Sequence, residues 1–246
     1  MGSLYWAPPG FLFMKNSQVK NKNRLIFSPS YAMIGGEKVN FGNGKRGDEM
    51  KKYEILDRLV EEGNGYLQTS SALANGVSKQ TLGKYVKTRN MERVAHGVYL
   101  SEDAWPDDYY LLCIRNSKAV FSYESSLYLH GLMDREPSAT TVTVPKDYNA
   151  THIKKQGVRV IHAVPDLYAI GITVKETAFG NNVAVYDRER TICDIIRSKK
   201  EIEVQTFQTA MKEYMGSKGK NLSNLIRYAR NLGIEEEVRT YTEVML

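Results

Sequence analysis

The turn dipeptide Asn75-Gly76 limits the folds open to this chain more than any other feature, because it separates two short helical stretches. Before it, Thr69-Ser70 offers helix-capping side chains, and residues 71–74 are expected to be helical. After it, Ser78 is expected to cap a second helix that runs to about Arg89. The sequence therefore predicts a pair of helices joined by a tight turn.

The second helix of this pair has two unlike faces. Leu82 and Val86 are four residues apart, so they share an apolar face that is expected to pack inward. Gln80, Lys84 and Lys87 share the opposite face. A helix with an apolar face and a Gln/Lys face suits the anionic groove of a nucleic acid.

The flanking segments complete a recognisable unit. Residues 51–62 form an apolar-striped helix, which Gly63-Asn64-Gly65 ends. Residues 91–100 are typical of a β-hairpin that turns at His96-Gly97. The predicted core joins the stripe of the first helix to Leu73, Leu82, Val86, Val94 and Val98. A helix, a tight turn, a basic helix and a hairpin in this order predict a winged helix-turn-helix.

This unit supplies the candidate DNA contacts. A lysine stripe on a lone helix is usually only a solvated face, but its place on the second helix of such a unit favours nucleic-acid binding. His96 by itself is an ordinary turn residue with no expected chemistry. The expected DNA-binding residues are Ser78, Lys79, Gln80, Thr81, Lys84, Lys87, Arg89, Arg93 and His96.

The charge of the chain is unevenly distributed. Its 246 residues carry a net charge of +6. Residues 1–49 hold seven Lys/Arg and three Asp/Glu, residues 50–101 hold eight and five, and residues 102–246 hold nineteen and twenty. The basic excess lies in the first two segments, where it would attract phosphate backbones.

Two further features of the sequence indicate where in the cell the protein is located. The chain has no apolar run near the roughly 18 residues that a membrane span needs. Its two cysteines, Cys113 and Cys193, lie in apolar surroundings and are expected to be buried free thiols. Both observations suit a cytoplasmic protein that makes no membrane contact.

The predicted fold class is α+β, with an N-terminal winged helix-turn-helix followed by a mixed α+β C-terminal domain. Residues 1–49 are expected to be a leader or a non-native extension, and residues 50–101 the DNA-binding domain. Residues 102–108 are acidic, contain Pro106 and are expected to be a linker. Residues 109–246 show strand patterns at 119–121, 141–144, 158–162 and 183–186, with another at Val174, and a helical period from Arg188.

We find no residue pattern typical of catalysis, a metal site or a cofactor. His130, His152 and His162 stand on different predicted elements without a close ligand pair. The loop at residues 216–220 fails the phosphate-loop pattern, because Tyr214 and Asn221 occupy the positions that need Gly and Ser/Thr. The carboxylates of Asp187, Glu189 and Asp194 are expected to form local ion pairs with Arg188, Arg190 and Arg197.

The second domain carries its own basic clusters. They are possible additional DNA contacts, although solvated loops are the favoured interpretation. The residues are Lys154, Lys155, Arg159, Lys199 and Lys200.

An ordered series of motifs resembles one known family. Residues 51–100, ending in Arg93-Val94-Ala95-His96-Gly97-Val98-Tyr99, resemble the N-terminal domain of AbiEi-type antitoxins. The segment 121–132, Val142-Thr143-Val144-Pro145, residues 157–160 and residues 189–197 resemble that family's second domain in the same order. The resemblance covers about residues 50–230, and its strength lies in the order of the motifs.

The resemblance implies a type IV antitoxin and transcriptional autorepressor of an abortive phage-infection locus. Its partners would be double-stranded promoter DNA with repeats and a functionally paired nucleotidyltransferase-like toxin. In type IV systems direct contact between the two proteins is not required. The second domain would supply antitoxicity.

Two other classes of function remain open. A DNA-targeted enzyme such as a nuclease would need clustered carboxylates with a lysine, and that spacing is missing from the predicted strands. A repressor with a ligand-sensing domain is the other alternative.

Overall fold

The computed structural model describes residues 45–245. Residues 1–44 of the predicted leader fall outside the described residues. The last five residues of that predicted segment begin the first helix, α1, which spans Lys45–Glu62 and so starts six residues before the predicted helix. Among the described residues, no helix is both long enough and apolar enough to cross a bilayer.

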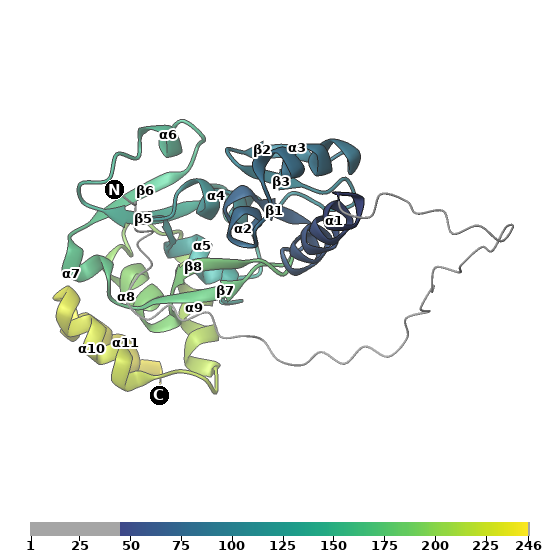
Figure 1. Ribbon diagram of the computed structural model, residues 1–246. Helices are drawn as coiled ribbons and strands as arrows, with labels where there is room; N and C mark the ends of the chain where they lie inside the picture. The colour runs from purple at the N-terminus through teal and green to yellow at the C-terminus, as the bar shows by residue number, and fades with distance from the viewer. Residues whose placement is uncertain (1–44, 246) are drawn as a thin grey trace, which may run out of the picture. The chain divides into compact units, whose positions relative to one another are not determined.

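The N-terminal elements form a small helical group with a three-stranded sheet (Figure 1). The strands pair antiparallel in the order β1-β3-β2, and the hairpin between β2 and β3 turns at His96-Gly97 as predicted. Strand β1 was not predicted. The elements are α1, β1 (Tyr66–Gln68), α2 (Thr69–Ala74), α3 (Lys79–Thr88), β2 (Glu92–Ala95) and β3 (Val98–Leu100).

Two details of the first short helix correct the sequence prediction. Gln68, in an extended conformation, is the N-cap of α2, so Thr69 and Ser70 are helical residues rather than caps. Leu73 was predicted to join the core, but it is 41% exposed. Ala72 is buried in the core instead, at 0% exposure. Successive residues of a helix point in different directions, so Leu73 faces solvent when Ala72 faces the core.

The core of these N-terminal elements lies between α1 and α3. Leu56 of α1 and Leu82 of α3 are buried in one cluster with Leu67 of β1. Val98 and the half-buried Val94 belong to a second cluster. That second cluster includes Leu111 of the next helix, so the hairpin packs on the chain that follows it.

The remaining elements are built on a five-stranded mixed sheet of order β6-β5-β4-β8-β7. The β5–β6 and β4–β8 pairs are parallel, and the β4–β5 and β7–β8 pairs are antiparallel. The elements are α4 (Asp108–Arg115), β4 (Val120–Phe121), α5 (Tyr123–Leu129), β5 (Thr141–Pro145), α6 (Thr151–Lys154), β6 (Arg159–Ala163), α7 (Pro165–Tyr168), β7 (Ile172–Glu176) and β8 (Asn182–Tyr186).

This sheet is covered on both faces at β5, because residues 141–144 point alternately to the two faces and all four are buried. Val142 and Val144 of β5 point into a cluster with α4 and α6. Thr143, between them, lies on the other face, where its hydroxyl donates to Ser122 Oγ at 2.9 Å. Helices and two sheets in one chain confirm the predicted α+β class.

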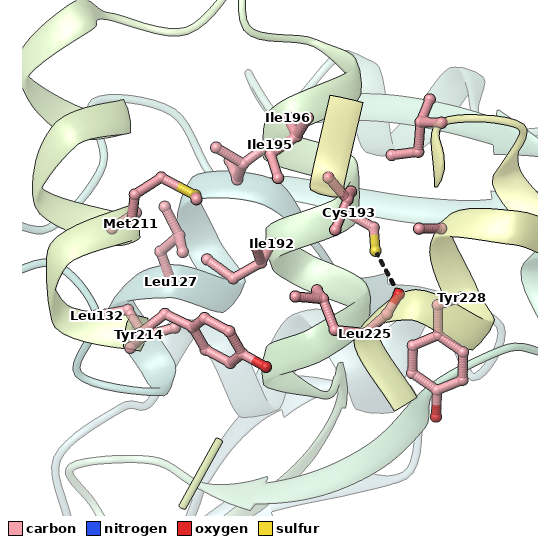
Figure 2. Packing of buried hydrophobic residues seen from close by; sticks show 14 of the residues in the cluster. Leu127, Leu132, Ile192, Cys193, Ile195, Ile196, Met211, Tyr214, Leu225 and Tyr228 are labelled. Atoms are coloured by element: carbon pink, nitrogen blue, oxygen red, sulfur yellow. Dashed lines mark hydrogen bonds between the residues drawn. The ribbon is translucent and has the colours of Figure 1, made fainter. Parts of the chain in front are cut away.

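Four helices close the chain: α8 (Arg188–Arg197), α9 (Val204–Gly216), α10 (Leu222–Leu232) and α11 (Glu235–Met245). Helix α8 is the centre of the largest apolar cluster, to which it contributes Ile192, Ile195 and Ile196 (Figure 2). Cys193 is fully buried beside Leu225, and burial raises the pKa of its thiol to about 12. Both cysteines are free thiols, as expected, but Cys113 is half-buried rather than buried.

The predicted linker contains a buried polar centre. Asp107 is 1% exposed, and its Oδ2 accepts hydrogen bonds from Thr177 Oγ1 at 2.6 Å and Asn181 Nδ2 at 2.8 Å. Its backbone N–H donates to the hydroxyl of Tyr66 in β1 at 2.7 Å. Asn64 adds a bond from Nδ2 to the carbonyl of Gly180 at 2.7 Å. Residues on both sides of the predicted linker therefore share hydrogen bonds, and the division into two domains stays a prediction.

Candidate nucleic-acid interface

Ser78 and Thr81 determine where α3 begins. Ser78 is extended, and its Oγ accepts a hydrogen bond from the backbone N–H of Thr81 at 3.1 Å. The two hydroxyls are 2.9 Å apart and share a second hydrogen bond. Ser78 is therefore the cap that the sequence predicted, and both side chains, predicted to contact DNA, are also engaged in holding the helix start.

The two faces of α3 are divided as predicted. Leu82 and Tyr85 are buried at 3% and 2% exposure, while Gln80, Lys84 and Lys87 are exposed. Lys79 is exposed in the first turn. Within residues 45–245, Lys79 and Lys87 take part in no salt bridge, so their charges are available to an anion.

Two other cations of this region are paired with carboxylates of α1. Lys84 Nζ lies 2.9 Å from Glu49 Oε1, and that hydrogen bond raises the pKa of the lysine. Arg89 Nη2 lies 2.9 Å from both oxygens of Asp57. All four side chains are at least 41% exposed, so solvent and ligands reach both pairs.

Asp57 is held from a second direction. The buried Tyr85 donates its hydroxyl proton to Asp57 Oδ1 at 2.7 Å. Burial, followed by this bond to Asp57, raises the pKa of the Tyr85 hydroxyl, which therefore stays protonated as the donor. The guanidinium of Arg89 also lies over the Tyr85 ring, with its Cζ 5.7 Å from the centroid.

The hairpin presents the remaining predicted contacts. Arg93, in β2, is exposed, and so is His96 in the turn. Gly97 has a φ of +71°, and a Cβ there would lie 3.3 Å from Thr69 Oγ1, so glycine suits this turn best. The Gly97 carbonyl accepts the Thr69 N–H at 2.7 Å, which ties the hairpin to α2.

The additional cations of the second half do not form one cluster. Lys154 and Lys155 are exposed at α6, and Lys199 and Lys200 are exposed after α8. Arg159, grouped with Lys154 and Lys155 from sequence, instead pairs with Glu201 at 2.8 Å and Glu124 at 3.9 Å. Long-range pairing of this kind leaves no pattern in a local stretch of sequence.

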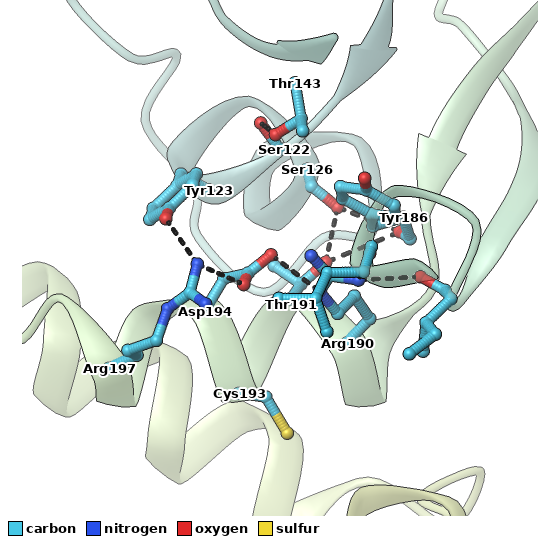
Figure 3. Close-up of polar contacts among 12 residues, drawn as sticks. Ser122, Tyr123, Ser126, Thr143, Tyr186, Arg190, Thr191, Cys193, Asp194 and Arg197 are labelled. Atoms are coloured by element: carbon cyan, nitrogen blue, oxygen red, sulfur yellow. Dashed lines mark hydrogen bonds and ion pairs between the residues drawn. The ribbon is translucent and has the colours of Figure 1, made fainter. Parts of the chain in front are cut away.

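The carboxylate of Asp194, in the second half of α8, is structural (Figure 3). Asp194 is 1% exposed and pairs with Arg190 Nε at 3.0 Å and Arg197 Nη2 at 3.4 Å. Asp187 caps α8 through the Arg190 N–H. Local ion pairing was predicted for all three carboxylates and is confirmed for Asp194. Glu189 instead accepts hydrogen bonds from the Tyr214 hydroxyl and the Asn221 N–H, and Asp187 also accepts one from the Tyr228 hydroxyl. In residues 45–245, no three His, Cys, Asp or Glu side chains are grouped to hold a metal ion.

Sequence reasoning missed Glu49 and Asp57 as members of this surface. They lie 35 and 32 residues before the cations they pair with, so no local spacing links them. Only the packing of α1 beside α3 brings the carboxylates to the edge of the basic face.

No protein-family model matches the sequence, and no curated protein does. A solved structure, the crystal structure of the RV2827C protein from Mycobacterium tuberculosis, is similar over 72% of this chain and 71% of that chain. Its TM-score is 0.46 and its sequence identity 12%. A similarity of this size assigns neither a family nor a function to the chain.

Proposed function

We propose that this chain is a DNA-binding transcriptional autorepressor and the antitoxin of a type IV toxin-antitoxin system. The observation that carries the DNA-binding part is the exposed face of α3, where Gln80, Lys84 and Lys87 lie opposite the buried Leu82 and Tyr85. Lys79 is exposed in the first turn beside this face. The order α1, β1, α2, α3 and a β2–β3 hairpin supports a winged helix-turn-helix, in which α3 would be the recognition helix.

In this proposal the recognition helix enters the major groove of promoter repeats. Gln80, near the start of α3, can pair with an adenine edge, because its amide offers one donor and one acceptor side by side. Lys79 and Lys87 neutralise phosphates and position the helix. Arg93 and His96 extend the contact along the hairpin to the neighbouring backbone.

The antitoxin part of the proposal rests on the resemblance of residues 50–230 to AbiEi-type antitoxins. The chain would act in the cytoplasm, repress its own operon and counteract a nucleotidyltransferase-like toxin during phage infection. It would do so without a stable complex with the toxin and without enzymatic activity of its own.

DNA binding is tested with a duplex from upstream of the chain's own gene and with a random duplex of equal length. We expect tighter binding to the first, and weaker binding to both for the Lys79→Gln/Lys87→Gln double variant. Lys212→Gln/Lys218→Gln is the matched control, since both lysines are exposed and lie outside α3 and the hairpin. Equal loss in the two double variants would contradict the proposed interface.

Repeating the same assay with magnesium distinguishes a repressor from a nuclease. We expect the DNA to remain intact, and cleavage by purified protein would contradict the proposal.

Antitoxicity is tested by expressing the chain with the product of the adjacent gene. Growth that is restored without co-purification of the two proteins is the expected result.

A further inference from the structure

The basic face of α3 is bordered by carboxylates that belong to α1. Asp57 pairs with Arg89, and Glu49 pairs with Lys84. Glu49 and Asp57 are eight residues apart, so they are separated by roughly 12 Å along α1. Of the four cations on and just after α3, two thus face a carboxylate at 2.9 Å, and two, Lys79 and Lys87, face none within residues 45–245.

Before any base contact forms, these ion pairs weaken phosphate binding to the same extent for every DNA sequence. An exposed ion pair is weak, so a phosphate can displace the carboxylate. The displaced carboxylate nevertheless stays within a Debye length of about 10 Å and repels the phosphates. Unrelated DNA lacks base contacts that could compensate for this repulsion, whereas a specific site has them.

We infer that Asp57 is a specificity-determining residue, which keeps Arg89 from binding the phosphates of unrelated DNA and releases it at the specific site. This inference rests on the proposed DNA binding. Asp57 suits the role because the Tyr85 hydroxyl anchors its Oδ1 at 2.7 Å, so the carboxylate stays in place when Arg89 leaves. Glu49 acts on Lys84 in the same way.

Arg89 is well suited to such an exchange. Only its Nη2 contacts Asp57, and the side chain is 52% exposed. Arginine carries five N–H donors, so most of its donors face away from the carboxylate and can meet a phosphate. Arg89 is the C-cap of α3, whereas base edges are contacted by residues near the N-terminus of a recognition helix, so a phosphate is the contact we infer for Arg89.

The test is Asp57→Asn in the full chain, because asparagine keeps an oxygen acceptor for Tyr85 and removes the charge. On a random duplex we expect about threefold to tenfold tighter binding at 0.1 M salt, as one more phosphate is neutralised. The slope of log affinity against log salt should become more negative by about 0.9. On the specific site, affinity should rise by at most about fivefold, with the slope unchanged. The ratio of specific to non-specific affinity therefore falls.

Glu54→Gln is the matched control. It removes the same charge from an exposed position on α1, and Glu54 pairs with no cation in residues 45–245. Asp57→Asn placed on an Arg89→Gln background should leave the slope unchanged and should raise affinity no more than Glu54→Gln does, since only the repulsion by the lost charge remains. Thermal unfolding of each variant confirms that the fold is kept.

The outcomes separate this inference from the proposed function. If the wild-type chain binds DNA with a salt-dependent affinity but Asp57→Asn behaves like Glu54→Gln, the inference is overturned and the proposed function stands. Weaker binding of Asp57→Asn to random DNA also overturns it, because Asp57 would then support Arg89 rather than restrain it. If the wild-type chain shows no salt-dependent DNA binding, the proposed function fails and the inference fails with it.

Discussion

Gln80 is the residue on which sequence recognition by α3 depends in our proposal. Its side chain is exposed one position after the start of the helix, and it lies on the opposite face from Leu82. A bidentate contact with adenine distinguishes bases, whereas a lysine contact with phosphate does not. The two kinds of side chain should therefore respond differently to substitution.

Replacing Gln80 by Ala is expected to cost about 1–3 kcal/mol of binding free energy on the specific site and little on unrelated DNA. Replacing Lys87 by Ala should weaken binding to both duplexes by about the same factor. Fluorescence anisotropy at one fixed salt concentration measures all four affinities. An equal loss on both duplexes for Gln80→Ala would mean that Gln80 only positions the helix.

At the scale of one element, the start of α3 depends on its cap. Ser78→Ala removes the oxygen that accepts the Thr81 N–H, so we expect a loss of about 0.5–2 kcal/mol in the free energy of unfolding. Ser223→Ala is a suitable control, because Ser223 is exposed within α10 and Asn221 caps that helix. Urea denaturation followed by circular dichroism compares the free energies of unfolding of the two variants. Equal values would show that the Ser78 cap contributes little to stability.

Asp107 connects the N-terminal elements to the turn between β7 and β8. Asp107→Ala leaves the donors of Thr177, Asn181 and the start of α4 without their acceptor. We expect a loss of roughly 2–4 kcal/mol in unfolding free energy from the cap and the unsatisfied donors. Asp108→Ala, at the exposed neighbouring position, should cost much less. Comparable melting temperatures for the two variants would show that the buried network contributes little.

At the scale of the whole molecule, binding should depend on salt in proportion to the phosphates neutralised. If Lys79, Lys84, Lys87 and Arg89 each neutralise one phosphate on the specific site, log affinity should fall against log salt with a slope near −4 (approximately −0.9 per contact). A titration between low and moderate salt measures this slope. A value near zero would rule out phosphate binding by this face.

The whole molecule also decides which fragment can fold. Leu111 of α4 shares a buried cluster with Tyr66, Val98 and Leu100, so a fragment of residues 45–101 would expose part of its core. We expect a fragment of residues 45–116 to unfold cooperatively and at a higher temperature than residues 45–101. Both should fail to protect cells from the toxin, because the resemblance assigns antitoxicity to the second domain. Protection by either fragment would contradict that assignment.

Much of the local structure could be predicted from the sequence because it depends on neighbouring residues. Ser78 precedes a helix with an apolar stripe, His96-Gly97 is a tight turn, and Thr141–Pro145 alternates as a strand does. Caps, turns and periodicity act within a few residues, so a single stretch contains the information. The exposed Gln/Lys face of α3 was predictable for the same reason.

What the sequence alone determined is therefore the order and kind of most elements and the basic face of α3. Tertiary structure decided which cations on that face are free, because Glu49 and Asp57 reach Lys84 and Arg89 only when α1 packs beside α3. It also decided that Arg159 is paired with Glu201 and that Asp107 is a buried centre rather than a linker residue. Charge pairing and burial depend on distances in space, and residues 32 to 74 positions apart carry no local trace of them.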